Sequence, residues 1–182
     1  NINLVPVNEI IVTGLDKKNN MELNDKLNFL KIDNLFFLKR NQIEEKINLN
    51  NQVEKYFVQK IYPKTIKITI SRTKILARLK KNGDNFLLGS NGKFIKEKDN
   101  KYDVPFIFGD FENKNFFELK DTIEKTNFDY DKIKNLFFFK SGRWDIETKN
   151  GLLIKLPKDR LKESLKLLVR ILEEEKEKKI HK

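Results

Sequence analysis

Few residues of this sequence have side chains suited to catalysis. The single histidine, His181, stands in the charged C-terminal run, and the chain contains no cysteine. A histidine-dependent triad, a zinc cluster, a thiol nucleophile and a disulfide framework are therefore excluded. The acidic pairs Glu44–Glu45 and Asp129–Asp131 have polar neighbours, which argues against the burial that a catalytic dyad requires. The sequence predicts no catalytic residue and no metal ligand.

The glycine-containing run GSNG (Gly89–Gly92) does not predict a phosphate-binding loop. Such a loop joins a strand to the N-terminus of a helix, whereas this run stands at the turn of a predicted β-hairpin. We therefore expect neither a cofactor nor a small-molecule substrate.

The chain is strongly basic, but its charges are evenly spread. A net charge of +11 and an isoelectric point near 9.6 would suit nucleic acid or an anionic membrane surface. Lysines alternate with aspartate and glutamate, however, so we interpret the charge as a solvated basic surface and expect no nucleic-acid partner.

The sequence starts at Asn1 without a methionine and has no apolar window of about eighteen residues. We expect a piece of a longer protein, without a membrane span inside it.

The first part of the chain predicts a strand and two helices. Residues 8–16 (NEIIVTGLD) form a β-branched run that ends at Gly14, which is typical of a strand closing in a turn. Short helices are expected over residues 21–30 and 39–48, the second with Asn41 as its N-cap.

Two strand-like runs follow, over residues 51–63 and 64–80, with a proline turn between them. In the second run Ile66, Ile68 and Ile70 alternate with polar residues, so one face of this strand is expected to be buried. The predicted order is β-α-α-β-β, a small α+β unit.

This order of elements resembles the POTRA domain of the bacterial cell-division proteins FtsQ and DivIB. The resemblance depends on a Val-x-Gly strand end and on a basic residue before an aromatic–proline turn. The matching positions are Val12, Thr13, Gly14, Val53, Lys60, Tyr62, Pro63 and Ala77. The chain departs from the family at Gln52, where the family has tryptophan, and at Arg72 and Ile75, where it has glutamate and proline.

The second part of the chain follows the same family in the order of its elements. The predicted elements are a hairpin at residues 85–95, a helix at 114–127, a strand at 132–140, a hairpin at 142–157 and a final helix after Pro157. Both hairpins turn at an Asn-Gly pair, which is a strong short-range signal.

In the second hairpin, Trp144 and Ile146 face one way and Arg143, Asp145 and Glu147 face the other. We expect Trp144 to be a structural anchor in the core and Arg143 to be displayed outward.

The final helix has Asp159 as its expected N-cap. Its apolar stripe, which we interpret as core packing, consists of Leu161, Leu165, Leu168 and Leu172. The family has one further strand after this helix, and we expect that strand to be absent from this sequence, which ends at Lys182.

The resemblance, from Asn8 to Leu172, implies an α+β fold with two domains. A POTRA-like β-α-α-β-β domain would occupy residues 9–79, and a mostly antiparallel β domain with covering helices residues 80–175. Residues 1–8 would be a linker from a missing N-terminal membrane anchor, and residues 176–182 a charged tail.

The resemblance also implies a function. The protein would be a divisome scaffold without enzymatic activity, a single-pass protein of the cell inner membrane with this part on the periplasmic side of the septum. Its partners would be the FtsB–FtsL pair and other septal membrane proteins, docked by addition of a strand to a sheet edge.

Four residues are candidates for partner binding. Lys55, Val58 and Lys60 lie on the POTRA strand that contributes to recruitment in the family, although lysines that guard an edge strand against aggregation predict the same pattern. Arg143 stands where the family displays a basic residue close to the tryptophan, and it is either a contact residue or an ordinary solvated arginine.

Two other classes of function remain open from the sequence. A POTRA-containing component of outer-membrane assembly or secretion would carry repeated POTRA units, and no second copy occurs in this sequence. A basic nucleic-acid-binding module would lose affinity steeply as salt rises.

Overall fold

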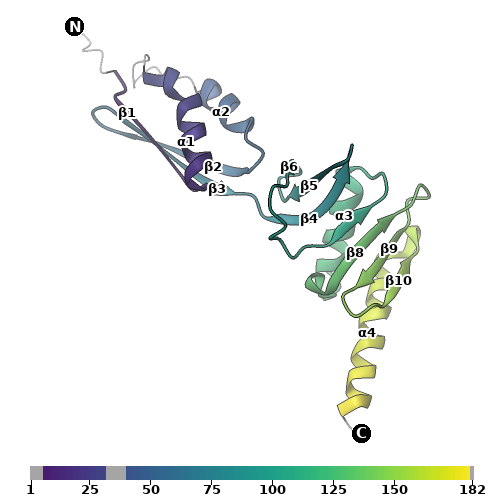
Figure 1. Ribbon diagram of the computed structural model, residues 1–182. Coiled ribbons are helices and arrows are strands. Elements are labelled where there is room, and N and C mark those ends of the chain that lie inside the picture. Colours follow the sequence, from purple (N-terminus) through teal and green to yellow (C-terminus); the bar gives the residue numbers. More distant parts are fainter. Residues whose placement is uncertain (1–5, 32–39, 181–182) are drawn as a thin grey trace. The chain divides into compact units, whose positions relative to one another are not determined.

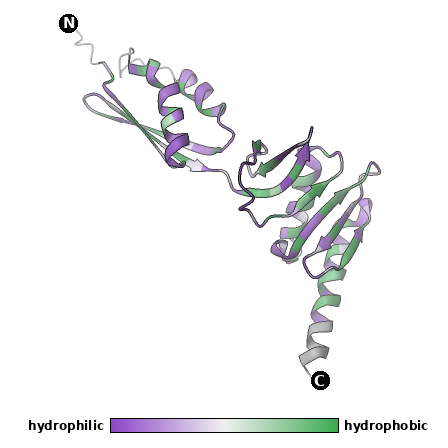
Figure 2. Ribbon diagram, viewed as in Figure 1, coloured by the Kyte–Doolittle hydropathy of each residue, from purple (hydrophilic) through white to green (hydrophobic). Residues whose placement is uncertain are grey.

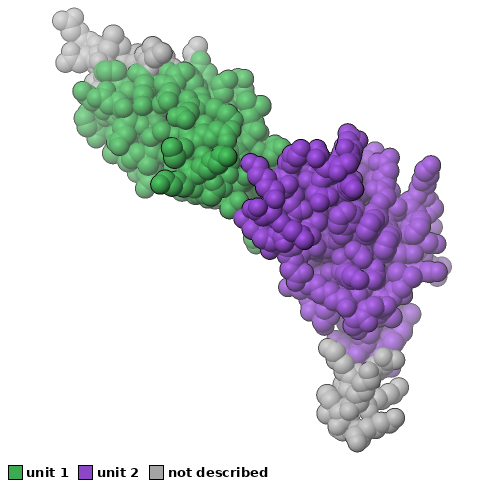
Figure 3. All heavy atoms as spheres, viewed as in Figure 1, with its two compact units in different colours: residues 1–75, 89–95 green, residues 76–88, 96–182 purple. Residues whose placement is uncertain are grey.

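The computed structural model describes residues 6–31 and 40–180. Contacts divide the chain into two compact units, drawn in different colours in Figure 3. The first unit contains the residues up to Ile75 together with residues 89–95, and the second contains the remaining residues.

The first unit is a three-stranded sheet with helices on one face (Figure 1). Its elements are β1 (Glu9–Thr13), α1 (Lys17–Lys26), the 3-10 helix η1 (Asn28–Lys31), α2 (Arg40–Asn48), β2 (Val53–Ile61) and β3 (Thr65–Arg72). The strand order is β1-β3-β2, with β1 parallel and β2 antiparallel to the central β3. The predicted β-α-α-β-β order is confirmed, and the alternating isoleucines of β3 are all buried.

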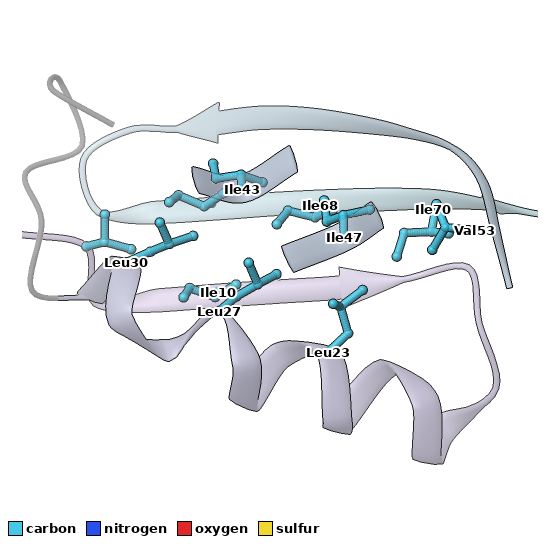
Figure 4. Packing of buried hydrophobic residues seen from close by; sticks show 11 residues of the cluster. Ile10, Leu23, Leu27, Leu30, Ile43, Ile47, Val53, Ile68 and Ile70 are labelled. Atoms are coloured by element: carbon cyan, nitrogen blue, oxygen red, sulfur yellow. The ribbon is translucent and has the colours of Figure 1, made fainter. Parts of the chain in front are cut away.

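The core of the first unit lies between the sheet and the helices (Figure 4). The carboxylate of Asp16 caps α1 by accepting a hydrogen bond from the backbone of the first turn, and Leu23 and Leu27 then face the sheet. Gly14, between β1 and α1, has a φ of +109°, and a Cβ there would overlap the carbonyl oxygen of Ile70. Only glycine can therefore occupy position 14.

Two sequence predictions are wrong in this region. Asn41 lies inside α2 and is not its N-cap, and the residue that precedes this helix lies outside the described residues. The run 64–80 is not one strand, because it breaks at residues 73–74 into β3 and β4, which belong to different sheets. At the break the backbone N–H of Lys74 donates to the side-chain hydroxyl of Ser90 (3.0 Å) and not to the backbone of a neighbouring strand.

The other sheet has seven strands in the order β10-β9-β8-β7-β4-β5-β6. The elements from β4 onward are β4 (Ile75–Lys81), β5 (Asp84–Gly89), β6 (Phe94–Lys96), β7 (Phe106–Phe108), α3 (Asn113–Glu124), η2 (Tyr130–Lys132), β8 (Ile133–Phe138), β9 (Trp144–Thr148), β10 (Leu153–Leu156), η3 (Lys158–Arg160) and α4 (Leu161–Ile180). Strand β7 is parallel to both of its neighbours, and the β8-β9-β10 meander is antiparallel. The α+β class, with covering helices α3 and α4, is confirmed (Figure 1).

Residues 89–95, which connect β5 to β6, group with the first unit. The side-chain amide of Asn91 donates to the backbone oxygens of Asn51 (3.0 Å) and Val53 (2.9 Å). The hydroxyl of Ser90 donates to the carboxylate of Glu54 (2.8 Å). These contacts fix the start of β2, where the ladder with β3 is irregular.

The final helix differs from the prediction in its N-cap and in the burial of its apolar stripe. Asp159 lies in η3 and is not the N-cap of α4. Within the stripe Leu165 is fully buried, whereas Leu161, Leu168 and Leu172 are half-buried. The interpretation as core packing therefore holds for Leu165, and α4 continues beyond the strands that it covers (Figure 1).

Candidate docking surfaces

The β9–β10 hairpin is attached to the core through Trp144. This residue pairs with Phe138 on β8 and with Leu156 on β10. Its buried ring lies 4.7 Å from the ring of Phe138 and 6.0 Å from that of Phe111, measured between centroids. The Trp144 ring therefore joins β9 to β8 and to the segment that precedes α3.

The neighbours of Trp144 in sequence form an ion pair on the other face of the sheet. Nη2 of Arg143 donates a hydrogen bond to Oδ2 of Asp145 (3.3 Å), and Nε of Arg143 lies 3.0 Å from Oδ1 of the same carboxylate. The Arg143 side chain is 41% exposed and that of Asp145 only 6%. Asp145 is buried on this face because Phe137 and Lys155 flank it in register and Arg143 lies beside it.

Arg143 also borders a group of aromatic side chains, which we call the aromatic strip. The strip consists of Phe106, Phe108, Phe137 and Phe139. Its rings follow one another, with 4.6 Å between the centroids of Phe106 and Phe108 and 5.0 Å between those of Phe108 and Phe137, which are stacked. The guanidinium of Arg143 lies over the ring of Phe139, 4.5 Å from its centroid.

The aromatic strip lies on the sheet face opposite to the helices. Ile107 stands between Phe106 and Phe108 and is buried, so its neighbours point the other way. Phe108 is 43% exposed, and Phe139 is exposed to a similar extent. Hydrophobic residues therefore occur on both faces of these strands. The hydrophobic residues of β8 are drawn green in Figure 2.

The same face carries a charged network next to the strip. The side-chain amide of Asn135 donates to Glu147 (2.8 Å), and the ammonium group of Lys134 lies 3.4 Å from the same carboxylate. The hydrogen bond from Asn135, followed by the contact with Lys134, lowers the pKa of Glu147. Glu147 is therefore ionised at neutral pH and forms an ion pair with Lys134.

One edge of this sheet is β10. The strand order ends there, so among the described residues β10 is hydrogen-bonded only to β9. Ile154 and Leu156 point into the core, whereas Leu153 and Lys155 are exposed on the face that carries the aromatic strip. An unpaired strand edge of this kind exposes backbone N–H and C=O groups to a partner.

The other candidate residues lie on β2, the edge strand of the three-stranded sheet. Val58 and Lys60 pair with Ile68 and Ile66, so both stand on the helix-covered face, where Val58 is half-buried. Lys55 pairs with Ser71 on the open face. The structure thus places all the predicted β2 residues on one edge, but divides them between two faces.

Residues that the sequence analysis did not select are prominent on both open faces. Phe57 on β2 is exposed, and so is Phe108 of the aromatic strip. One signal was present, since the runs FIF (106–108) and LFFF (136–139) are apolar at every position. A strand covered by helices on one side only must expose half of such a run.

The described part of the chain holds no group of three or more His, Asp or Glu residues that could bind a metal ion. In the same residues, no helix combines the length and the apolar character needed to cross a membrane.

Comparison with known proteins gives matches along nearly the whole chain. A family model described as "Cell division protein FtsQ/DivIB, C-terminal" matches residues 77–181. A model described as "POTRA domain, FtsQ-type" matches residues 5–72. The chain belongs to the FtsQ/DivIB family of cell division proteins. The resemblance stated from the sequence is confirmed.

Individual members of the FtsQ/DivIB family are distant relatives. The chain is 29% identical over 130 residues to a cell division protein FtsQ of Rhizobium radiobacter, a match that covers 68% of this chain and 60% of the relative. It is 23% identical over 160 residues to FtsQ of Rickettsia bellii strain RML369-C, covering 87% of this chain and 60% of the relative. The chain thus spans about three fifths of the length of these relatives.

A solved structure also matches part of the chain. It is the major extracytoplasmic domain of the cell division protein DivIB from Geobacillus stearothermophilus, with 14% identity and a TM-score of 0.40. The match covers 52% of this chain and 87% of that domain.

Proposed function

We propose that this chain is the extracytoplasmic part of a divisome scaffold that has no catalytic activity and that docks the FtsB–FtsL pair at the septum. Membership of the FtsQ/DivIB family, matched from residue 5 to residue 181, carries this proposal. The proposed protein is single-pass in the inner membrane, with its anchor before this chain and this part in the periplasm. Other septal membrane proteins are further partners.

The proposed mode of docking is strand addition at β10. A partner segment in extended conformation forms backbone hydrogen bonds with the free edge, which supply affinity without a requirement for particular side chains. Specificity comes from the side chains that the new strand meets. On the open face these are Leu153 and Lys155 at the edge, with the aromatic strip further along the sheet.

Arg143 contributes the second part of the proposed site. Its contact with Asp145 and its position over Phe139 hold the guanidinium in one place while leaving it partly exposed. A partner carboxylate that approaches this guanidinium forms a charge-assisted hydrogen bond in a site already partly shielded from water. Arg143 then selects an acidic residue in the partner.

The β2 edge is a separate surface in this proposal. Lys55, Val58 and Lys60 contact other septal membrane proteins there, with the two lysines attracting acidic segments. The irregular register at the start of β2, after Val53, shortens the length of edge on which another strand can add without interruption.

The test is a calorimetric titration of the chain with the extracytoplasmic segments of an FtsB–FtsL pair. Arg143→Gln should weaken binding about tenfold, which corresponds to the loss of one charge-assisted hydrogen bond. Arg170→Gln is the matched control, because Arg170 is exposed on α4 and its loss changes the net charge equally. Equal weakening by both variants would show that Arg143 acts only through the net charge of the chain and not through a specific contact.

A longer version that continues beyond Lys182 is titrated beside this chain. Tight binding by both versions supports docking at β10, whereas tight binding by the longer version alone places the docking edge in the additional residues. Absence of binding by either version removes the FtsB–FtsL proposal. Tight, steeply salt-dependent binding of duplex DNA would contradict the scaffold proposal altogether.

A further inference from the structure

The turn between β2 and β3 combines exposed apolar and basic side chains. We call residues 60–64 the β2–β3 tip. Ile61 is 39% exposed and Tyr62 is 62% exposed, although both side chains are large and mostly apolar. Two such neighbours at the end of a hairpin form a small apolar projection from the first unit.

Lysines stand on both sides of this projection. Lys60 precedes Ile61 on β2, Lys64 precedes β3, and both lysines are exposed. Within the part of the chain that the structure describes, neither ammonium group forms an ion pair. Glu9 is the acidic residue that the register places beside the tip, opposite Thr65, whose hydroxyl donates to it (3.3 Å). The tip is therefore net positive.

The tip lies where the chain enters the first unit. The backbone N–H groups of Asn8 and Glu9 donate to the carbonyl oxygen of Lys64, at 2.9 Å and 3.3 Å. Figure 4 shows Leu30 at this same end of the sheet. Asn8, which leads into β1, thus lies directly beside the tip.

We propose that the β2–β3 tip binds the surface of an anionic lipid bilayer. Lys64 contacts the phosphate groups, and so does Lys60 when the β2 edge holds no protein partner, while Ile61 and the ring of Tyr62 enter the interfacial region, where amphipathic aromatic rings are favoured. The positive charge of the tip is complementary to such a surface, and the apolar projection fits a bilayer better than a strongly charged polymer. This inference rests on the proposed function in one respect, since an anchor before β1 brings this end to the membrane.

The first test is flotation of the chain with vesicles of phosphatidylcholine and with vesicles of phosphatidylcholine and phosphatidylglycerol in equal amounts. Binding to the mixed vesicles alone is expected. Lysines near an anionic surface contribute about fivefold in affinity each, so Lys60→Gln with Lys64→Gln should weaken binding about 25-fold. The control, Lys98→Gln with Lys166→Gln, removes the same charge from exposed positions elsewhere and should change binding less than about twofold.

The second test uses the absence of cysteine from the chain. A polarity-sensitive dye on Tyr62→Cys should shift its emission to shorter wavelength when mixed vesicles are added, whereas the same dye on Lys166→Cys should not. No shift at position 62, equal weakening by both lysine pairs, or equal binding to both kinds of vesicle would each overturn the proposal.

Failure of this inference is distinguishable from failure of the proposed function. The vesicle assays contain no protein partner, and the titration with the FtsB–FtsL pair contains no lipid. If the labelled tip binds a protein partner in the absence of lipid and does not bind vesicles, the tip is a protein-docking element and the membrane proposal is wrong.

Discussion

Replacing Arg143 by glutamine should destabilise the second unit much more than replacing Asp145 by asparagine. The Asp145 side chain is 6% exposed, whereas that of Arg143 is 41% exposed. Loss of the guanidinium removes the hydrogen bond that Nη2 donates to Oδ2 of Asp145 and leaves a buried carboxylate without its neighbouring positive charge. Loss of the carboxylate charge leaves an arginine that water can solvate. The asymmetry follows from the unequal burial of the two groups.

The magnitude lies between those of buried and exposed ion pairs. Removing one partner of a fully buried pair costs about 3–5 kcal/mol, and an exposed pair contributes about 0–1 kcal/mol. Because Arg143 is partly exposed, water reaches the vacated space, and we expect about 2 kcal/mol for Arg143→Gln. Asp145→Asn keeps the volume of the side chain and should cost about 0.5 kcal/mol. The double variant should behave like Asp145→Asn alone, which gives a coupling energy of about 2 kcal/mol.

The assay is urea unfolding of the variants followed by tryptophan fluorescence. Trp144 is the only tryptophan of the chain, and its ring packs against Phe138 and Phe111, so its emission reports on the second unit. Equal costs for the two single variants, or single costs that add in the double variant, would refute the reasoning. In either case the buried charge of Asp145 would not be stabilised by Arg143.

Two further predictions concern the covering elements of the second unit. Burial raises the pKa of Tyr130, and the charges of Asp131 and Glu124 raise it further, while its hydroxyl donates to the Leu76 carbonyl (2.8 Å). The folded-state pKa of Tyr130 lies above the ordinary value of 10.0, so the folded protein holds the hydroxyl proton more tightly than the unfolded chain does. The stability that the protonated Tyr130 contributes is therefore fully present below pH 10 and is lost as pH rises further. Tyr130→Phe should therefore lose less stability than the parent chain above pH 10 in urea unfolding. Leu165→Ala, which empties a fully buried position, should cost about 2–4 kcal/mol in the same assay, against less than about 0.5 kcal/mol for the exposed Leu167→Ala.

Arg143 also shows how far sequence reasoning reached at the candidate site. Alternation along β9 correctly separates Trp144 from its charged neighbours, because successive side chains of a strand point to opposite faces. Alternation does not show whether the second face is open to water. Asp145 is buried by residues of β8 and β10 that are distant in sequence, so its burial required the register of three strands.

The break within residues 64–80 has a similar explanation. Each half of this run has strand composition, and nothing local distinguishes one long strand from two. At the division the Lys74 backbone N–H donates to the hydroxyl of Ser90, which is distant in sequence. The Asn82-Gly83 turn then joins β4 to β5 and was not predicted from the sequence. Asn82 adopts a φ of 52° there and Gly83 one of 86°.

The sequence by itself determined the features that depend on neighbouring residues. Periodicity, Asn-Gly turns and the glycine after β1 are local, so they predicted the β-α-α-β-β order, the β9–β10 hairpin and the family. The tertiary structure alone decided which edges and faces are free. The exposure of β2, β10 and the aromatic strip depends on where the helices lie and on which strands pair, and these contacts join residues far apart in the chain.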